Sequence, residues 1–431
     1  MKRDGFLKVF SLLLISMMVI GMPCELKAQN EQVDRINGSD RYATAVAICQ
    51  AGWQSSEYVV LARGDEFADA LAGVPLAYSL DAPILLTKPR ELPDVTRQEI
   101  VSLQAKRVII LGGTGAVSAE IESLLEDEIG LTVERLSGSN RYATAAAIAH
   151  RMQAEGKVQG KAVIANGTVF PDALAASAYA AKAGYPILLC QRDEVPMATK
   201  QVLAELNLGS VYVIGGTSVV GTEVMGSLPN PQRISGANRY ATAVALAENF
   251  MPQGKKFFVA TGLSFADAIS GGVLAAKNDA GLLLLGKDVP EAVRNLLTGI
   301  AQGQLTILGG KAAISDKVQG DLQALVSGEI DPESEPIGDG TWTSSPSWEG
   351  AITSDFKLGK LGGLQGATHY ELYVDNVLID SRVAINQSVT TLSLFFQEPE
   401  ILLVKFYDGP NTVTPIATGR CYSDGTMKIS R

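Results

Sequence analysis

Three arginines at equivalent positions are the side chains of this sequence best suited to hold an anion. Each follows a short polar residue in the segments "GSDRYATA", "GSNRYATA" and "GANRYATA", which places Arg41, Arg141 and Arg239 after Asp40, Asn140 and Asn238. Asp and Asn are favoured helix N-caps, so each arginine falls at the first helical position, where the helix dipole disfavours a cation by roughly 0.3 kcal/mol. Local preference does not explain three such placements, so an anion must compensate them, inside the protein or outside it.

A second motif, Ala-x-Gly-x-x-Phe-x-Asp-Ala, follows each arginine as "ARGDEFADA", "ANGTVFPDA" and "ATGLSFADA". It supplies the aspartates Asp69, Asp172 and Asp267 and the glycines Gly64, Gly167 and Gly262. Each aspartate is expected in the first turn of a helix, where the dipole favours it. One interpretation is an Arg–Asp bridge within each copy. The other is that helix N-termini, glycine loops and arginines converge on an anionic ligand, and the two can coexist.

A further arginine lies six residues before each of these, at Arg35, Arg135 and Arg233. It could belong to the same anion site or be a solvated residue at a strand end. Sequence alone leaves both possibilities open.

The elements that carry these residues are repeated as a whole. The helix-start arginines are spaced by 100 and 98 residues, and the agreement continues through "APILL", "YPILL" and "AGLLLL" to "ILGGTGAVS", "VIGGTSVVG" and "ILGGKAAIS". Short apolar runs alternate with segments of helical period, which predicts three small α/β domains with parallel sheets. Ligands of such sheets bind at the carboxyl ends of the strands, where the glycine turns fall.

The helix after each Phe-x-Asp-Ala motif is lined by small residues such as Ala72, Gly73, Ala175 and Gly271. They favour close packing on the domain's own sheet, although they would also let another copy approach around a pseudo-threefold axis. After Ser327 the composition changes. An acidic segment predicts a linker, and the β-branched and aromatic runs that follow it predict a β-sandwich.

The predicted boundaries are a signal peptide (1–28), three repeats (31–132, 133–230 and 231–327), a linker (328–340) and a β-rich C-terminal domain (341–431). A basic start followed by "VFSLLLISMMVI" predicts export and cleavage near Ala28, and no later stretch is long enough to span a membrane. Loss of that peptide takes away Lys2, Arg3, Lys8 and Lys27 against Asp4 and Glu25, so the net charge of −10 becomes about −12. Nucleic acid is therefore not an expected partner.

These motifs resemble the cell-wall-binding repeat type 2 family, which usually occurs as three tandem copies in exported proteins of Gram-positive bacteria. The resemblance covers roughly residues 33–327. It implies Toprim-like or Rossmann-like domains that form an intramolecular pseudo-trimer within a monomer. It also implies noncovalent anchoring to the wall through an anionic secondary polymer, teichoic-acid-like or polysaccharide. In this family a separate domain supplies the individual function, which here would be the C-terminal β-domain.

The third copy departs from the pattern at two places. Gly281 stands where the other copies have Pro83 and Pro186, and Lys311 replaces Thr114 and Thr217. If the "PILL" segment contributes to the polymer site, the third site is the doubtful one.

Enzymatic motifs are absent from the sequence. Its two histidines, His150 and His369, belong to no metalloprotease, serine-nucleophile or cysteine-nucleophile pattern, and no cofactor or metal is expected. The three cysteines of the mature chain, Cys49, Cys190 and Cys421, do not suggest a disulfide framework. We therefore expect a binding protein without catalytic residues. The alternative is a wall-modifying hydrolase or a sugar-binding adhesin whose activity lies in the C-terminal domain, where Trp342, Trp348, Tyr370 and Tyr373 could stack on a sugar.

Overall fold

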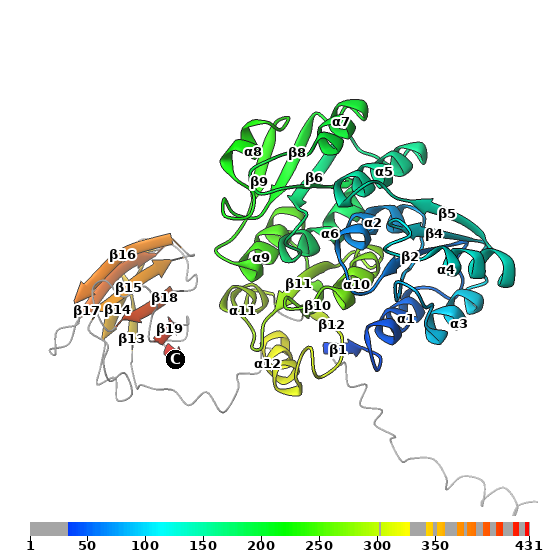
Figure 1. Cartoon of the computed structure of the whole chain (residues 1–431). Helices are drawn as coiled ribbons and strands as arrows, with labels where there is room; N and C mark the ends of the chain where they lie inside the picture. Colours follow the sequence, from blue (N-terminus) through cyan, green and yellow to red (C-terminus); the bar gives the residue numbers. More distant parts are fainter. Residues whose placement is uncertain are drawn as a thin grey trace, which may run out of the picture. The chain divides into compact units, whose positions relative to one another are not determined.

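The computed structural model describes residues 33–300 and 303–327 in full and, beyond them, only the backbone of the C-terminal strands. The chain divides after Glu329 into two compact units, which are described separately (Figure 1). The predicted signal peptide and linker lie outside the described residues. No helix in the described part is long and apolar enough to cross a bilayer.

The first unit contains three α/β repeats. The elements of repeat 1 are β1 (Val33–Ile36), α1 (Arg41–Gly52), β2 (Tyr58–Arg63), α2 (Ala68–Ser79), β3 (Ile84–Thr87), α3 (Asp94–Ser102), β4 (Arg107–Leu111), α4 (Ala119–Ser123) and the π-helical turn η1 (Leu124–Glu128).

Repeat 2 comprises β5 (Thr132–Leu136), α5 (Arg141–Ala154), β6 (Lys161–Asn166), α6 (Pro171–Ala183), β7 (Ile187–Cys190), α7 (Met197–Glu205), β8 (Ser210–Ile214) and α8 (Thr222–Gly226). Repeat 3 comprises β9 (Pro231–Ile234), α9 (Arg239–Phe250), β10 (Lys256–Thr261), α10 (Ala266–Lys277), β11 (Gly281–Leu285), α11 (Glu291–Thr298), β12 (Gln304–Leu308) and α12 (Asp316–Ser327).

Each repeat forms a four-stranded parallel sheet, as the sequence predicts, but the sheets are offset from the repeats by one strand. The strand orders are β3-β2-β4-β5, β7-β6-β8-β9 and β1-β12-β10-β11. The first strand of each repeat therefore completes the sheet of the repeat before it. In the third sheet that strand is β1, from the start of the chain, with Val33 paired to Leu305 and Ile36 to Leu308.

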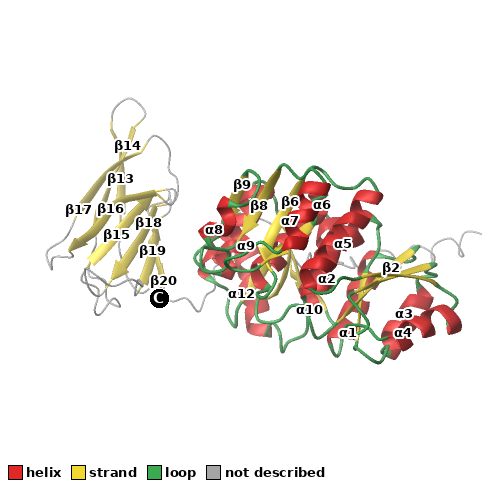
Figure 2. Cartoon of the chain, turned by 45° about the horizontal axis from the view of Figure 1, so that its top comes forward, coloured by secondary structure: helices red, strands yellow, loops and turns green. Residues whose placement is uncertain are grey.

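This offset closes the three repeats into a ring, in which blue β1 lies beside yellow β12 (Figure 1). The central strands β2, β6 and β10 are buried along most of their length because helices cover both faces of each sheet. Figure 2 shows α2, α5 and α6 between the strands of the first and second sheets. One hydrophobic core extends through all three repeats, with a second cluster in repeat 2.

Helices α2, α6 and α10 pack on one another at the centre of the ring, which gives the pseudo-threefold arrangement. The small residues of these helices allow close packing on two partners, the sheet of their own repeat and the central helices of the other repeats. The sequence favoured only the first of these. A Cβ at Gly73 would lie 2.2 Å from Leu111 of its own sheet, whereas one at Gly272 would lie 2.7 Å from Ser177 Oγ of α6. Ser270 also donates to the Ile84 carbonyl of repeat 1 at 3.0 Å. Close packing on the own sheet is thus combined with close approach of the neighbouring repeats.

The C-terminal strands are β13 (Trp342–Ser347), β14 (Ala351–Lys357), β15 (His369–Val374), β16 (Val377–Ala384), β17 (Thr391–Phe396), β18 (Leu402–Tyr407), β19 (Ala417–Cys421) and β20 (Met427–Ser430). They pair antiparallel in the orders β13-β14-β17 and β16-β15-β18-β19-β20. The β-sandwich remains a prediction, and the side chains of Trp342, Tyr370 and Tyr373 lie outside the described residues.

Candidate functional site

The helix-start arginines are held at the carboxyl end of the strand that follows them. Asp40, Asn140 and Asn238 cap the helices as predicted, and their side chains accept from the amides of Ala43, Ala143 and Ala241 at 2.8–3.0 Å. From the first helical position Arg41 Nη1 donates to the Gly64 carbonyl at 2.5 Å. Arg141 and Arg239 donate to Gly167 and Gly262 at 2.6 and 2.5 Å. A backbone carbonyl therefore fixes one nitrogen of each guanidinium. A second nitrogen of Arg141, Nη2, lies 3.9 Å from Glu66 Oε2.

Close approach explains the glycines of this motif. A Cβ at Gly64 would lie 2.9 Å from the Tyr42 ring and 3.2 Å from Arg41 Cδ, and Gly167 and Gly262 have the same neighbours in their repeats. These glycines position the arginine through their carbonyl oxygen and leave room for its side chain.

The aspartates do not pair with the arginine of their own repeat, so the Arg–Asp bridge expected within each copy is wrong. Burial raises the pKa of Asp69, and the Thr144 hydroxyl and Arg141 of repeat 2 oppose that rise. Burial also raises the pKa of Asp172, opposed by Thr242 and Arg239 of repeat 3. The offset of the sheets causes this, because it brings the helix start of each repeat against the preceding repeat.

Asp267 completes the ring by facing repeat 1. Burial raises its pKa to about 6, and Arg41 is the group that lowers it. The arginines act on the aspartates through their charge, without an ion pair between them. We call the three places junction 1/2 (Asp69 and Arg141), junction 2/3 (Asp172 and Arg239) and junction 3/1 (Asp267 and Arg41).

A glycine with positive φ completes each junction. Gly112, Gly215 and Gly309 have φ of 95°, 103° and 103°. A Cβ on them would lie 2.5, 2.8 and 2.4 Å from Oδ2 of Asp69, Asp172 and Asp267. Only glycine meets both requirements, which accounts for the first glycine of the "GG" turn in every repeat.

An open pocket of about 340 Å³ lies at junction 1/2. It is lined by Arg63, Glu66, Ala68, Asp69, Gly113, Gly115, Ala116, Gly138, Asn140, Arg141 and Thr144. Two of the predicted site residues, Asp69 and Arg141, thus meet in one pocket although they belong to different repeats. Thr144 was not predicted; the sequence signal was its recurrence as Thr44 and Thr242 in every "RYAT" segment.

The junctions meet at one end of the pseudo-threefold axis. Phe67, Phe170 and Phe265, which precede the aspartates by two residues, form a triad with ring centroids 5.6–6.0 Å apart. Arg141 lies over Phe67, 5.7 Å from its centroid. The carboxyl ends of the central strands therefore converge on a single face.

The strand-end arginines have a structural role instead. Arg135 donates to the carbonyls of Gly112 and Val117 at 2.9 Å and forms an ion pair with Glu122 at 2.6 Å. Arg35 donates to the Gly309 carbonyl at 2.8 Å and to Gln319, so it fastens the start of the chain to repeat 3. They are neither solvated residues nor free to bind a ligand.

Gly281, which replaces the proline of the other two "PILL" segments, is explained by the packing of repeat 3 on repeat 2. Gly281 opens β11, at the opposite end of the strand from the junctions, and a Cβ there would lie 2.4 Å from Tyr179 Oη of repeat 2. Repeats 1 and 3 have Leu76 and Leu274 where repeat 2 has Tyr179. The absence of proline from the third "PILL" segment therefore makes room for Tyr179 and gives no reason to doubt junction 3/1.

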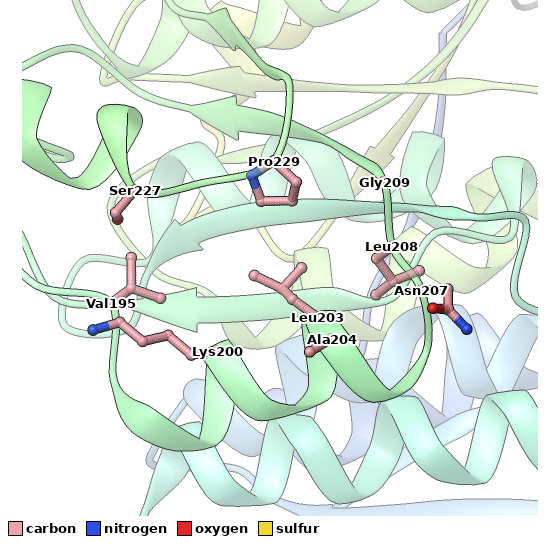
Figure 3. Close-up of a pocket in the computed structure, with 9 residues that line it drawn as sticks. All are labelled: Val195, Lys200, Leu203, Ala204, Asn207, Leu208, Gly209, Ser227 and Pro229. Atoms are coloured by element: carbon pink, nitrogen blue, oxygen red, sulfur yellow. The ribbon is translucent and has the colours of Figure 1, made fainter.

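A groove of about 420 Å³ lies on the outside of repeat 2, between α7 and the connection from α8 to β9 (Figure 3). Val195, Leu203 and Leu208 form its nearly buried floor, with Lys200 on its rim. The connection from the glycine turn to the edge strand is shorter in this repeat: Gly215 and Arg233 are 18 positions apart, against 23 for Gly112 and Arg135. None of the repeated arginines or aspartates lines it.

Residues 33–300 and 303–327 contain no group of three His, Cys, Asp or Glu side chains that could hold a metal ion. Cys49 and Cys190 are buried free thiols whose pKa burial raises, so they are poor nucleophiles.

Comparison with known proteins agrees with this architecture. The profile of the family "Cell wall binding domain 2 (CWB2)" matches residues 35–122, 135–225 and 233–319. The chain is 34% identical over 369 residues to N-acetylmuramoyl-L-alanine amidase LytC of Bacillus subtilis, which covers 84% of this chain and 73% of LytC. It is 32% identical over 295 residues to the amidase enhancer of the same organism, covering 67% of this chain and 40% of the enhancer.

Two solved structures from Clostridium difficile are similar. Cwp6 matches with a TM-score of 0.64 and 30% identity over 68% of this chain and 48% of Cwp6. Cwp8 matches with a TM-score of 0.61 and 26% identity over 68% of this chain and 52% of Cwp8. The chain thus spans about half the length of these two proteins. Since the profile matches occupy more than half of its residues, the chain belongs to the CWB2 family, and its three repeats are cell-wall-binding repeats of a protein located at the cell surface.

Proposed function

We propose that the chain anchors an exported protein noncovalently to the cell wall by binding an anionic wall polymer at the junctions between its repeats. The observation that carries this is the geometry of the helix-start arginines. Each is fixed by a glycine carbonyl at 2.5–2.6 Å at a helix N-terminus, and among the described residues Arg141 alone of the three also has an ion pair, with Glu66 at 3.9 Å. Oriented arginines at helix N-termini suit carboxylate or phosphate groups.

The loops that follow β3, β7 and β11 also carry cations, Lys88, Arg192 and Lys287, and the turn after β12 carries Lys311. Lys88, Arg192 and Lys311 each pair with a nearby carboxylate, so the helix-start arginines are the main local cations of the proposed site. The whole chain has a net charge of −10, yet at physiological salt the Debye length is only about 8 Å. Local cations on the converging face can therefore attract an anionic polymer in spite of the distant net charge.

The two ends of the chain have separate roles in this proposal. Residues 1–28 direct export, the mature chain acts as a monomer, and residues 341–431 form a β-domain that the anchor displays. In this proposal the polymer is teichoic-acid-like or an anionic polysaccharide, and the protein itself is not an enzyme.

A wall-modifying hydrolase is the second candidate, and the comparisons favour it over an adhesin. The alignment with the amidase LytC covers 84% of this chain, more than the three repeats occupy, and the amidase enhancer is also similar. Incubating the mature chain with purified walls separates the candidates. Release of peptidoglycan fragments supports the hydrolase, and intact walls with bound protein support the anchor.

Cosedimentation of the full mature chain with purified walls of the source organism, before and after chemical removal of their anionic polymers, tests the anchor. Binding should disappear with the polymer and weaken as salt rises. The control is a triple variant, Arg41→Gln, Arg141→Gln and Arg239→Gln, which should lose binding and keep its circular dichroism spectrum. Binding that is indifferent to stripping or to salt would contradict the electrostatic mechanism.

A further inference from the structure

The three junctions are not chemically equal, and the difference lies in the loop before each phenylalanine of the triad. Repeat 1 has Asp65 and Glu66 at the two positions where repeat 2 has Thr168 and Val169 and repeat 3 has Leu263 and Ser264. Only repeat 1 thus brings carboxylates to these positions.

Asp65 fastens its loop through side-chain hydrogen bonds, and uncharged residues do the same in the other two repeats. It accepts from Arg63 Nε and Nη2 at 2.7 and 2.8 Å. In repeat 2 Asn166 stands where Arg63 does, and its side chain accepts from the Thr168 amide at 2.8 Å. In repeat 3 Thr261 accepts from the Leu263 amide at 3.2 Å. All three loops are therefore fastened by side-chain hydrogen bonds. The hydrogen bond from Arg63 is the main cause that lowers the pKa of Asp65, and Arg41 contributes to the same shift.

Glu66 has no such local partner and reaches across the junction. Its Oε2 lies 3.9 Å from Arg141 Nη2, and half of its side chain is exposed. It also lines the junction 1/2 pocket and adds to the forces that raise the pKa of Asp69. The positions equivalent to Glu66 are Ser264 in the repeat that faces Arg41 and Val169 in the repeat that faces Arg239. Arg41 does have an acidic neighbour in its own repeat, Asp65, but the carboxylate of Asp65 is held by Arg63.

We propose that Glu66 blocks junction 1/2 against an anionic polymer, so that junctions 2/3 and 3/1 carry the binding. This inference rests on the proposed function. The carboxylate of Glu66 occupies the position beside Arg141 that an anionic group of the polymer would need, and it repels that group from the pocket. Lys311, in the turn after β12, pairs with Asp316 at 2.7 Å, so junction 3/1 depends on Arg41 for its positive charge.

Half-saturating wall concentrations of full-length variants test this, with purified walls as the probe and polymer-stripped walls as the blank. Arg41→Gln and Arg239→Gln should each weaken binding about tenfold, whereas Arg141→Gln should change it less than about twofold. Glu66→Ser should tighten binding about threefold by opening junction 1/2. The reciprocal Ser264→Glu should weaken it by about the same factor.

The combination Glu66→Ser with Arg141→Gln provides the sharpest control. Once Glu66 is gone, Arg141 should matter, so the double variant should lose the gain of Glu66→Ser. Equal losses for all three arginine variants, or no gain from Glu66→Ser, would overturn the inference while the anchor stands. Failure of the unsubstituted chain to bind polymer-bearing walls would overturn the anchor and the inference together.

Discussion

The strand-end arginines and the helix-start arginines occur six residues apart in the same three repeats, yet they differ in every contact. The Arg135 side chain is 13% exposed, uses both ends of its guanidinium on carbonyls and Glu122, and joins two repeats. The Arg141 side chain is 34% exposed, donates to one carbonyl and has one carboxylate neighbour, Glu66 at 3.9 Å. Recurrence in three copies therefore marks a requirement without saying whether folding or binding imposes it.

The largest expected effect is the difference in stability between a variant of a strand-end arginine and a variant of a helix-start arginine. Arg135→Gln should lower the free energy of unfolding by about 2–3 kcal/mol, because it breaks a partly buried ion pair and leaves carbonyls short of a donor. Arg141→Gln should lower it by less than about 1 kcal/mol, since its side chain is more exposed. Urea unfolding of both variants measures the difference. Equal losses would mean that the helix-start arginines are structural as well.

The second prediction concerns the two ends of a strand. Gly281→Ala should destabilise the protein by about 2 kcal/mol, because the new Cβ collides with Tyr179 Oη and Phe257 at the buried start of β11. Wall binding per folded molecule should stay unchanged, since the junctions lie at the other end of the strand. Adding Tyr179→Leu should give a double variant that loses less than the sum of the two single losses. Additive losses would show that Tyr179 is not the obstacle.

The smallest effect is a pH dependence at junction 3/1. Because burial raises the folded-state pKa of Asp267 to about 6, above an unfolded value of about 3.9, the folded chain binds the extra proton between these values. Its contribution to stability is therefore present at low pH and is lost as pH rises through this window. Asp267→Asn should be more stable at pH 7 by on the order of 1–2 kcal/mol, and the advantage should shrink towards pH 4. Thermal unfolding at both pH values checks this, and a pH-independent difference would contradict the cause.

Local patterns were sufficient to predict the elements and the edge of the sheet where the site lies. The caps Asp40, Asn140 and Asn238, the apolar strands and the glycine turns are all set by short-range physics, and the structure has them where they were expected. The partners of the aspartates could not be predicted in this way. Asp69 faces Arg141 because β5 joins the preceding sheet, and no local preference distinguishes the two sheets that a strand could join.

The roles of Glu66 and Gly281 could not be predicted from the sequence either, because both depend on residues of another repeat. In the sequence Glu66 is one exposed acid among many, and only its 3.9 Å distance from Arg141 gives it a role. In the sequence Gly281 is a departure from the "PILL" motif, and its reason is the neighbouring Tyr179, which leaves no room for a Cβ. Contacts between repeats, rather than within them, decide both cases.

Closure of the ring also fixes how many copies the architecture can contain. In an open stack of repeats a unit can be gained or lost at either end, because each unit contacts only its neighbours. Here β1 pairs with β12, so every repeat completes the sheet of the one before it and the last depends on the first. A chain that lost one repeat by recombination would leave an unpaired β12 edge and an unoccupied side of the α2–α6–α10 contact. Selection would therefore preserve the copy number of three as a unit, while the sequence of each junction remains free to diverge.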